Sequence, residues 1–232
     1  MDLTEILCGK IALVTGVTGG LGLEIARKLA DSGCEVHITG RNENRLGEIF
    51  DESGMFTSKT SVDLRKVDQI ERMIDSIQPD IMINCAGVFS VRDIVDTSEE
   101  EYDETFDVNV KAPFFLTKFS INYMRGKKWG RVVNIGSSSA YSGFAGTAVY
   151  CATKHALLGL SRSSYNELKD MGVRVYCVSP GSIKTEMGKK VPGQDFETFI
   201  EPKEIANVVA QAISFDGGMI SEEIRLNRVN VQ

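Results

Sequence analysis

Tyr150 and Lys154 are the two residues of this chain whose types and spacing most directly indicate chemistry. They lie four positions apart in the segment Tyr-Cys-Ala-Thr-Lys, and on a helix that spacing places the phenol beside the ammonium group, one turn away. A free tyrosine has a pKa of about 10, and a nearby positive charge favours the phenolate and lowers that pKa. The pair can therefore act as a proton donor and acceptor, although the same spacing also suits an exposed ring packed on a lysine stem.

A glycine-rich turn near the start of the chain has the composition of a phosphate-binding site. The segment from Thr15 to Gly22 reads Thr-Gly-Val-Thr-Gly-Gly-Leu-Gly, and it lies between an apolar run and an amphipathic stretch. Glycines allow a tight turn, and the N-terminus of the following helix offers free N–H groups and a positive dipole end to a pyrophosphate. The order of strand, turn and helix predicts a dinucleotide site.

Arg41 is expected to decide which nicotinamide nucleotide binds. Chains that prefer NAD commonly carry an acid at the end of the second strand, where this sequence has Thr-Gly-Arg-Asn at residues 39–42. A guanidinium group can bind a 2′-phosphate through two parallel hydrogen bonds, so we predict a preference for NADP(H). Glu43 is close enough to keep NAD(H) possible. The alternative for Arg41 is a solvated residue that opens the next helix.

The elements that must position these residues follow from an alternation of short β-rich runs with amphipathic stretches. Apolar residues at helical spacing, such as Ile70, Ile74 and Ile77, fall between the runs. This rhythm predicts an α/β fold, a Rossmann-type doubly wound parallel sheet of about seven strands with helices on both faces. The expected strands span residues 10–15, 35–39, 58–62, 80–84, 130–135 and 173–178, with a seventh at 223–229.

The composition suits a single domain over residues 1–232, with a short substrate lid at 186–201 in an irregular stretch. The chain is 42% hydrophobic, and its net charge of -6 argues against nucleic acid or anionic membrane as a partner. Five dispersed cysteines indicate reduced thiols and a cytoplasmic location. With two histidines we expect no metal site, and the apolar runs are shorter than the roughly 18 residues of a membrane span.

Several segments, taken together and in order, resemble the short-chain dehydrogenase/reductase family in its compact single-domain form. The glycine turn is similar to the family's cofactor turn, Asn-Cys-Ala-Gly at 84–87 to its Asn-Asn-Ala-Gly segment, and Pro-Gly-x-Ile-x-Thr at 180–185 to its nicotinamide-side turn. The resemblance implies that Asp63, with the Leu64 backbone, meets the adenine. The expected cofactor-binding residues are Gly16, Thr18, Gly20, Leu21, Gly22, Arg41, Asp63, Leu64, Asn84, Ala86, Gly87, Tyr150, Lys154, Pro180, Gly181, Ile183 and Thr185.

The same resemblance maps the family's catalytic set onto Asn109, Ser137, Tyr150 and Lys154. Ser138 is an alternative to Ser137, and the interval of thirteen residues before Tyr150 favours Ser137. In the reductive direction, Ser137 and Tyr150 would meet the carbonyl oxygen, and the phenol would give up its proton. The family further implies that Lys154 binds the nicotinamide ribose and that Asn109 holds a water in a proton relay. These roles describe an NAD(P)-dependent oxidoreductase that reduces a ketone or aldehyde, or runs in reverse.

The substrate is expected to be a small carbonyl compound or alcohol, but the family does not fix its identity. The chain is broadly similar to 3-oxoacyl-carrier-protein reductases, and the basic segment from Arg125 to Arg131 either meets the carrier's phosphopantetheine or forms a solvated loop. Lys189 and Lys190 in the lid could close over an anionic or acyl substrate. By the resemblance we expect a homodimer or homotetramer.

Two other classes of protein fit parts of the pattern. A non-catalytic NADP sensor would keep the glycines and Arg41 but could lose the catalytic hydroxyls and Lys154, all of which are present. An epimerase or dehydratase on the same scaffold would need a longer chain with an added substrate domain. The sequence therefore favours a carbonyl reductase.

Overall fold

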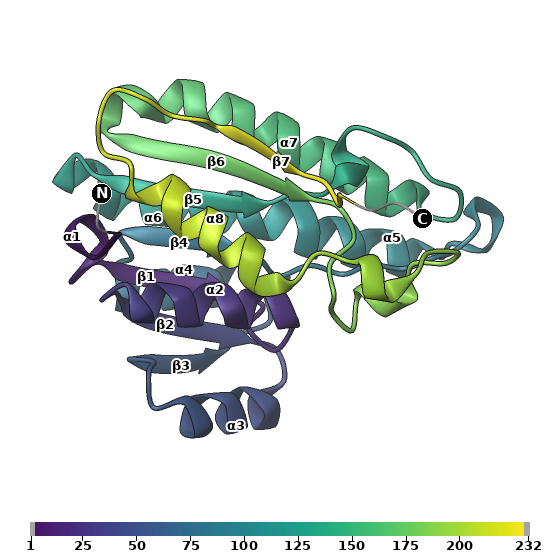
Figure 1. The fold of residues 1–232 in the computed structure, drawn as a ribbon, viewed down its shortest axis with the longest axis horizontal. Coiled ribbons are helices and arrows are strands. Elements are labelled where there is room, and N and C mark those ends of the chain that lie inside the picture. Colours follow the sequence, from purple (N-terminus) through teal and green to yellow (C-terminus); the bar gives the residue numbers. More distant parts are fainter. Residues whose placement is uncertain (1–2, 230–232) are drawn as a thin grey trace.

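Seven parallel strands form one sheet in the order β3-β2-β1-β4-β5-β6-β7 in a computed structural model that describes residues 3–229. This sheet, covered by helices, confirms the predicted fold class (Figure 1). The ends of the expected domain, residues 1–2 and 230–232, lie outside the described residues. The strands are β1 (Ile11–Thr15), β2 (Glu35–Gly40), β3 (Ser58–Ser61), β4 (Ile81–Asn84), β5 (Gly130–Ile135), β6 (Val173–Pro180) and β7 (Glu223–Leu226).

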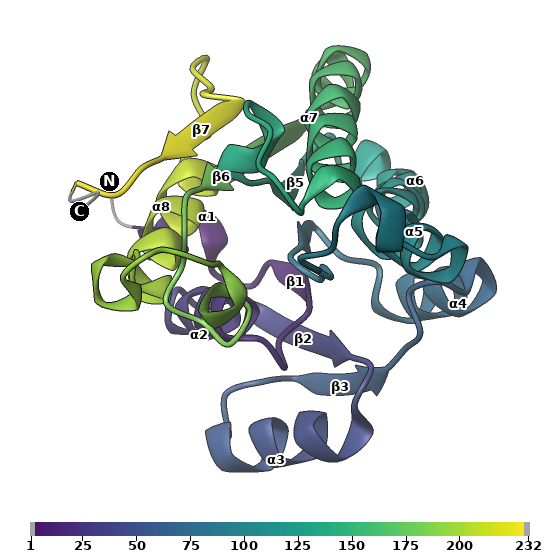
Figure 2. The ribbon, with the colours of Figure 1, turned by 90° about the vertical axis from the view of Figure 1, so that its right-hand side faces the viewer.

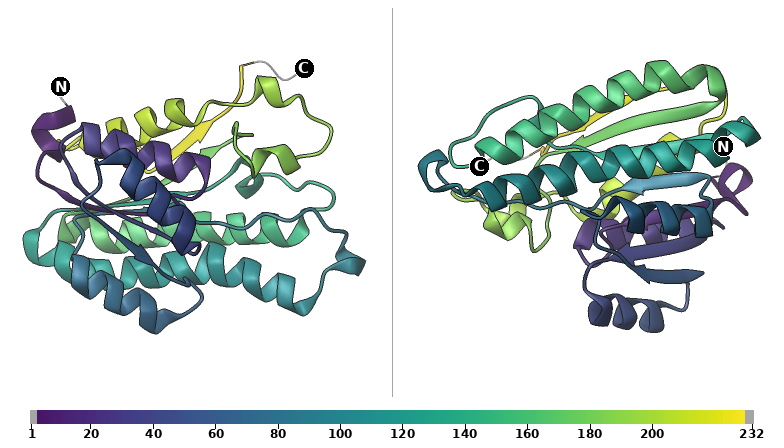
Figure 3. Two further views of the ribbon diagram at one scale, coloured as in Figure 1. Left: turned by 90° about the horizontal axis from the view of Figure 1, so that it is seen from below. Right: turned by 180° about the vertical axis from the view of Figure 1, so that it is seen from behind.

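Helices cover both faces of the sheet. Figures 2 and 3 show α1, α2 and α8 on one face and α4 to α7 on the other, with α3 beside the β2 and β3 edge. None of the helices within residues 3–229 is long and apolar enough to cross a membrane. The helices are α1 (Leu3–Leu7), α2 (Gly20–Asp31), α3 (Glu43–Ser53), α4 (Val67–Ile77), α5 (Glu99–Phe106), α6 (Ala112–Lys127), α7 (Ala148–Leu168) and α8 (Pro202–Ser214).

The apolar pattern of each element explains this layering. Along β1, Ala12 and Val14 point into the core on the α2 side, whereas Leu13 points into the core on the α4 side, because successive side chains of a strand face opposite ways. All four residues of β4 are buried, as expected for a central parallel strand covered on both faces. In α4, the apolar residues at helical spacing, Ile70, Met73, Ile74 and Ile77, are buried.

Between β1 and β4 the chain changes the side of the sheet on which it adds strands. The chain runs outward from β1 to β3 and then returns to place β4 on the other side of β1. Open parallel sheets bind ligands at such a switch point, beyond the carboxyl ends of the strands. The turn that follows β1 and the loop that follows β4 meet there.

Candidate active site

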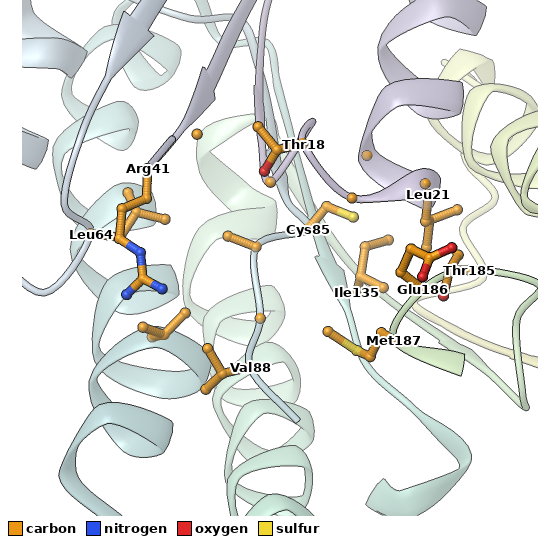
Figure 4. Close-up of a pocket in the computed structure, with 18 of the residues that line it drawn as sticks. Thr18, Leu21, Arg41, Leu64, Cys85, Val88, Ile135, Thr185, Glu186 and Met187 are labelled. Carbon is orange, nitrogen blue, oxygen red and sulfur yellow. The ribbon is translucent and has the colours of Figure 1, made fainter. Parts of the chain in front are cut away.

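A cavity of about 400 Å³ lies beyond the carboxyl ends of the central strands (Figure 4). Its lining comes from the turn after β1, the ends of β2 and β3, the loop after β4 and the first turns of α7. Fourteen of the residues expected to bind the cofactor contribute to it, so segments far apart in the sequence converge as expected. These are Gly16, Thr18, Gly20, Leu21, Gly22, Arg41, Asp63, Leu64, Ala86, Gly87, Tyr150, Lys154, Ile183 and Thr185.

The glycine turn has the geometry that a bound pyrophosphate requires. Gly16 has a φ of 75°, and a Cβ atom there would lie 2.7 Å from the Cα of Ala86. A Cβ atom on Gly22 would lie 2.6 Å from the carbonyl oxygen of Gly16. The residue that caps α2 is Gly19, which provides no side-chain hydrogen bond, so the backbone N–H groups of this helix face the cavity as donors for an anion.

Arg41 and Asp63 lie at the end of the cavity formed by β2 and β3, and each is engaged in an ion pair. The Nη1 of Arg41 is 2.9 Å from Oε1 of Glu104 in α5, while 65% of the arginine side chain remains exposed. Arg65 donates hydrogen bonds to both carboxylate oxygens of Asp63 and lowers the pKa of that group to about 2. The Nη1 of Arg65 is also 3.9 Å from Glu104. Arg41 is therefore part of a charged network rather than simply solvated.

Tyr150 and Lys154 lie one turn apart on α7, as their spacing predicts. Lys154 is buried, and its Nζ donates a hydrogen bond of 2.8 Å to the carbonyl oxygen of Ile135. That Nζ lies 5.7 Å from the centre of the Tyr150 ring. Burial lowers the pKa of Lys154 to about 8 because an apolar environment disfavours the charged form.

The expected depression of the Tyr150 pKa by Lys154 is wrong for this structure. Burial raises the pKa of Tyr150 to about 12, and the nearby hydroxyl of Ser137 opposes that rise only in part. The ammonium of Lys154 is directed at the Ile135 carbonyl, so it does not outweigh the desolvation of the phenol. The phenol is therefore protonated at neutral pH.

The serine cluster after β5 places Ser137 beside the phenol. Its hydroxyl accepts a hydrogen bond of 3.1 Å from the backbone N–H of Ser139 and caps the short 3-10 helix at residues 138–140. Ser137 and Ser138 both line a second cavity, but Ser137 is the one whose hydroxyl affects the Tyr150 pKa. This geometry supports the choice of Ser137 over Ser138.

Asn109 lies in a π-helical turn, Asp107–Lys111, between α5 and α6. Its side-chain oxygen accepts a hydrogen bond from the Val88 N–H, and its amide donates to the Val88 carbonyl and to the Thr153 hydroxyl, at 2.9, 3.0 and 3.2 Å. The side chain is buried and is absent from the described lining of both cavities. It ties the loop after β4 to α7, and thereby fixes one wall of the site.

Three other expected cofactor residues lie outside the first cavity. Asn84 is buried beneath it and donates to Asn134 at 2.7 Å, so it joins β4 to β5. Pro180 and Gly181 line the second cavity instead. Further residues line the first cavity and were not predicted, because nothing in their local sequence indicates contact with a ligand. They include Cys85, Val88, Ile135, Glu186 and Met187.

The second cavity adjoins the first and has a volume of about 210 Å³. The two cavities share Gly136, Tyr150, Ile183, Thr185 and Met187 in their linings. The ring of Phe89 packs edge-on against Tyr150 at a centroid distance of 4.8 Å. The phenol therefore lies at the boundary between a large cavity with a glycine turn and a smaller cavity with an aromatic wall.

The basic segment from Arg125 to Arg131 is at the opposite end of the sheet. It leads into β5 at the amino end of the strand (Figure 1). Both cavities are lined by residues at the carboxyl ends of the strands instead. Arg131 is buried, pairs with Asp216 at 2.6 Å and lies 4.3 Å over the Trp129 ring. The segment therefore lies away from both cavities, and its last residue, Arg131, is buried rather than part of a solvated loop.

Comparisons with known proteins agree with this geometry. A family model described as short chain dehydrogenase matches residues 10–195. The chain is 32% identical to the 3-oxoacyl-[acyl-carrier-protein] reductase FabG of Rickettsia bellii, over 92% of this chain and 98% of that protein. It is 31% identical to an uncharacterized oxidoreductase of Staphylococcus epidermidis, over 95% and 97% of the two chains.

Solved structures give the same result. A short chain dehydrogenase/reductase family protein superimposes with a TM-score of 0.87 and 32% identity, over 96% of this chain and 97% of that one. A metagenomic short-chain oxidoreductase in complex with NADP superimposes with a TM-score of 0.84 and 30% identity, over 97% and 99%.

Proposed function

The chain belongs to the short-chain dehydrogenase family and is an NAD(P)-dependent oxidoreductase, and from that premise we propose that it transfers hydride between NADP(H) and a small ketone or aldehyde. The observation that carries the proposal is the position of Tyr150, which lines both cavities. A group at that boundary can reach a carbonyl oxygen in the smaller cavity. The larger cavity, with its glycine turn and helix N-terminus, fits the dinucleotide.

In the proposed reaction, the bound nicotinamide supplies or accepts the hydride, and the protein handles one proton. During reduction, the hydroxyls of Ser137 and Tyr150 donate hydrogen bonds to the carbonyl oxygen as it gains negative charge. Because the pKa of Tyr150 is about 12, the phenol holds its proton at neutral pH and can transfer it to that oxygen. In the reverse direction, the phenolate accepts the proton of the alcohol.

Lys154 and Asn109 support this proton transfer in different ways. Lys154, which lines the larger cavity, would bind the nicotinamide ribose and stabilise the phenolate that remains after transfer. Asn109 holds the Val88 backbone and Thr153, so its contribution is to position the loop beside the cavity. We therefore assign Asn109 a positioning role, in addition to the water relay that the family resemblance implies.

The segment 186–201 is the proposed lid. It contributes Glu186 to the larger cavity, Val191 and Gln194 to the smaller one, and Met187 to both. Its 3-10 turns, Gly188–Lys190 and Phe196–Thr198, are short, and Phe199 anchors its end in the core. We propose that this segment, which faces both cavities, covers a bound substrate.

We propose NADP(H) as the preferred cofactor, with Arg41 as the group that binds its 2′-phosphate. The support is the position of Arg41 in the cavity lining and its exposed guanidinium. In Arg41→Ala, the ratio of NADPH to NADH catalytic efficiency should fall by about tenfold or more, because a charge-assisted bidentate contact is lost. An unchanged ratio would contradict the assignment.

The function itself is tested by NADPH consumption against a panel of aryl ketones, diketones, quinones, sugars, ketosteroids and 3-oxoacyl thioesters. Tyr150→Phe removes the proton-transferring oxygen alone, so turnover should fall by about three orders of magnitude while the Kd for NADPH stays the same. A sensor would bind NADPH and consume it with no member of the panel. The thioesters are included because relatives named 3-oxoacyl-[acyl-carrier-protein] reductase are 32% identical to this chain.

A further inference from the structure

The lining of the smaller cavity indicates the charge of the substrate, because no charged side chain is among the described residues that line it. Neither of the two lid lysines that the sequence suggested as partners for an anion, Lys189 and Lys190, is among those lining residues. Lys189 forms an ion pair with Glu186 at 2.5 Å. Lys184, which precedes the lid, pairs with Glu197 at 2.7 Å and with Glu201 at 3.3 Å. A carboxylate or phosphate placed in this cavity would have to give up water without gaining a cation, and that cost is large.

Two hydroxyl groups of the lining already donate hydrogen bonds within it. The Thr147 hydroxyl donates to the Phe144 carbonyl at 2.9 Å, and the Ser182 hydroxyl donates to the side-chain oxygen of Gln194 at 2.8 Å. A sugar or polyol binds through many hydrogen bonds, which these hydroxyls could make only by leaving their present partners. The lining therefore favours a substrate whose single demanding polar group is the carbonyl beside Ser137 and Tyr150.

The remaining wall of the cavity is apolar and aromatic. Phe89 packs edge-on against Tyr150, and Phe144 lines the cavity while 52% of its surface is exposed. The two loops that carry these rings lie side by side, because the Arg92 N–H donates to the Gly146 carbonyl at 2.7 Å. Met187, Val191 and Pro192 line the cavity from the lid.

The volume of the cavity bounds the part of the substrate that packs inside it. Its volume is about 210 Å³, whereas an apolar protein cavity of about 150 Å³ binds benzene. We propose that the part of the substrate bound here is uncharged and of about the size of one six-membered ring with its ketone or aldehyde group, packed against Phe89 and Phe144. This inference rests on the proposed function and narrows its substrate class.

Two ketones of nearly the same shape test the charge requirement. The nitro group of para-nitroacetophenone is neutral overall, and the carboxylate of para-acetylbenzoate is an anion. With NADPH as the cofactor, we expect kcat/KM to be at least about tenfold higher for the nitro compound, because the anion has no cation to meet it. Inhibition by nitrobenzene and by benzoate, measured as Ki against the better ketone, removes the difference in carbonyl reactivity and should show the same order.

Two variants connect that preference to the cavity. Phe144→Ala should raise KM for the aryl ketone several-fold and leave the Kd for NADPH unchanged, whereas Met219→Ala, which removes an exposed apolar side chain outside the lining, should change neither. Gln194→Arg adds a cation to the lining and should raise kcat/KM for para-acetylbenzoate by about tenfold.

The outcomes separate this inference from the proposed function. Equal kcat/KM values for the two ketones, or a better rate with the anion, would overturn the neutral substrate class while leaving the reductase intact. If neither ketone is reduced, binding of nitrobenzene and benzoate to the protein–NADPH complex is measured by ligand-observed NMR. Preferential binding of the neutral ring would then support the cavity assignment, while the reductase is decided by the panel described above. Equal or absent binding of both rings would overturn the cavity assignment.

Discussion

Lys154 shows how burial and charge compete at a single residue. Its ammonium has one hydrogen bond, to the Ile135 carbonyl, and lies in an interior position where burial lowers its pKa from 10.5 to about 8. A charged group in such a place lowers the free energy of unfolding. Such a loss of stability is common at functional sites. Burial also keeps Tyr150 protonated, so desolvation affects the pKa values of both residues more than either residue affects the other.

Replacing this lysine by an uncharged residue should therefore stabilise the cofactor-free protein. The pKa difference between 10.5 and about 8 corresponds to about 3 kcal/mol, and loss of the hydrogen bond to Ile135 subtracts about 1 kcal/mol. For Lys154→Met we expect the free energy of unfolding at pH 7, measured by urea titration, to rise by about 1–2 kcal/mol. Turnover should be lost in the same variant.

The pH dependence of the free energy of unfolding gained in Lys154→Met identifies the cause of that gain. Because the folded pKa is lowered, the penalty is fully present below pH 8 and disappears between about pH 8 and 10.5, where the folded protein has lost the proton that the unfolded chain still binds. The advantage of Lys154→Met over wild type should shrink across that window. The exposed Lys203→Met should stay within about 0.5 kcal/mol of wild type, and a destabilised Lys154→Met would contradict the argument.

At the scale of elements, the end of the cavity at β2 contains a carboxylate that α5 brings close to Arg41. Glu104 is 63 positions from Arg41 in the sequence, and the two side chains are 2.9 Å apart. A 2′-phosphate bound by Arg41 would share that guanidinium with Glu104 and would be repelled by it. Glu104 is therefore expected to weaken NADPH binding relative to NADH binding.

In Glu104→Gln, the Kd for NADPH, followed by nucleotide fluorescence at low salt, should fall by about two- to fivefold, the range of an exposed ionic interaction. The Kd for NADH should not change. Glu100→Gln makes the same charge change one turn earlier on α5 and should leave both constants as they are. Weaker NADPH binding in Glu104→Gln would mean that the carboxylate holds Arg41 in place instead of competing for it.

The turn between β1 and α2 depends on two properties of glycine, its tolerance of a positive φ and its lack of a Cβ atom. Gly9 is a control that separates the two. Gly16 and Gly9 have similar positive φ values, 75° and 71°. A Cβ atom at Gly16 would overlap the Ala86 backbone at 2.7 Å, whereas one at Gly9 would meet nothing within 4 Å. Gly9→Ala should cost about 1 kcal/mol of unfolding free energy, from backbone strain alone.

Gly16→Ala adds the overlap with Ala86 to the same strain, so it should cost more than Gly9→Ala by at least about 1 kcal/mol. It should also weaken NADPH binding by more than tenfold, because the displaced backbone is the cofactor-binding turn itself. The measurements are urea unfolding and nucleotide titration. Equal destabilisation by the two variants would show that the turn yields freely to a methyl group.

The elements that follow from local pattern were predictable, and the contacts between them were not. The strand at 130–135 agrees with β5 residue by residue, and Arg41 lies just before α3, whose start Asn42 caps. The pairing of Arg41 with Glu104 and the use of the Asn109 amide on Val88 join distant segments. Sequence spacing contains no information about such tertiary pairs, or about how far burial moves a pKa.

At the scale of the whole molecule, the parallel sheet places the site and the helix layers decide which surfaces remain exposed. The turn after β1 and the loop after β4 meet because these strands are neighbours, and this explains why residues as far apart as Gly16 and Gln194 line adjoining cavities. On the face covered by α4 to α7 (Figure 3), Tyr102 of α5 and Phe114 of α6 are 47% and 45% exposed. Apolar patches on a protein surface mark interfaces between chains, and these two side chains are the place on this face at which such an interface is tested.

The proposed homo-oligomer should therefore form through this helical face. Light scattering at micromolar concentration should give two or four times the mass of the chain for wild type, and Phe114→Glu should shift the mass toward that of one chain, because the charge would have to be buried in the interface. Met219→Glu makes a similar change at a site that is 64% exposed on the loop before β7, and its mass should equal that of wild type. A single-chain mass for wild type would refute the oligomer, and an unchanged mass for Phe114→Glu would move the interface to another face, such as the edge of β7.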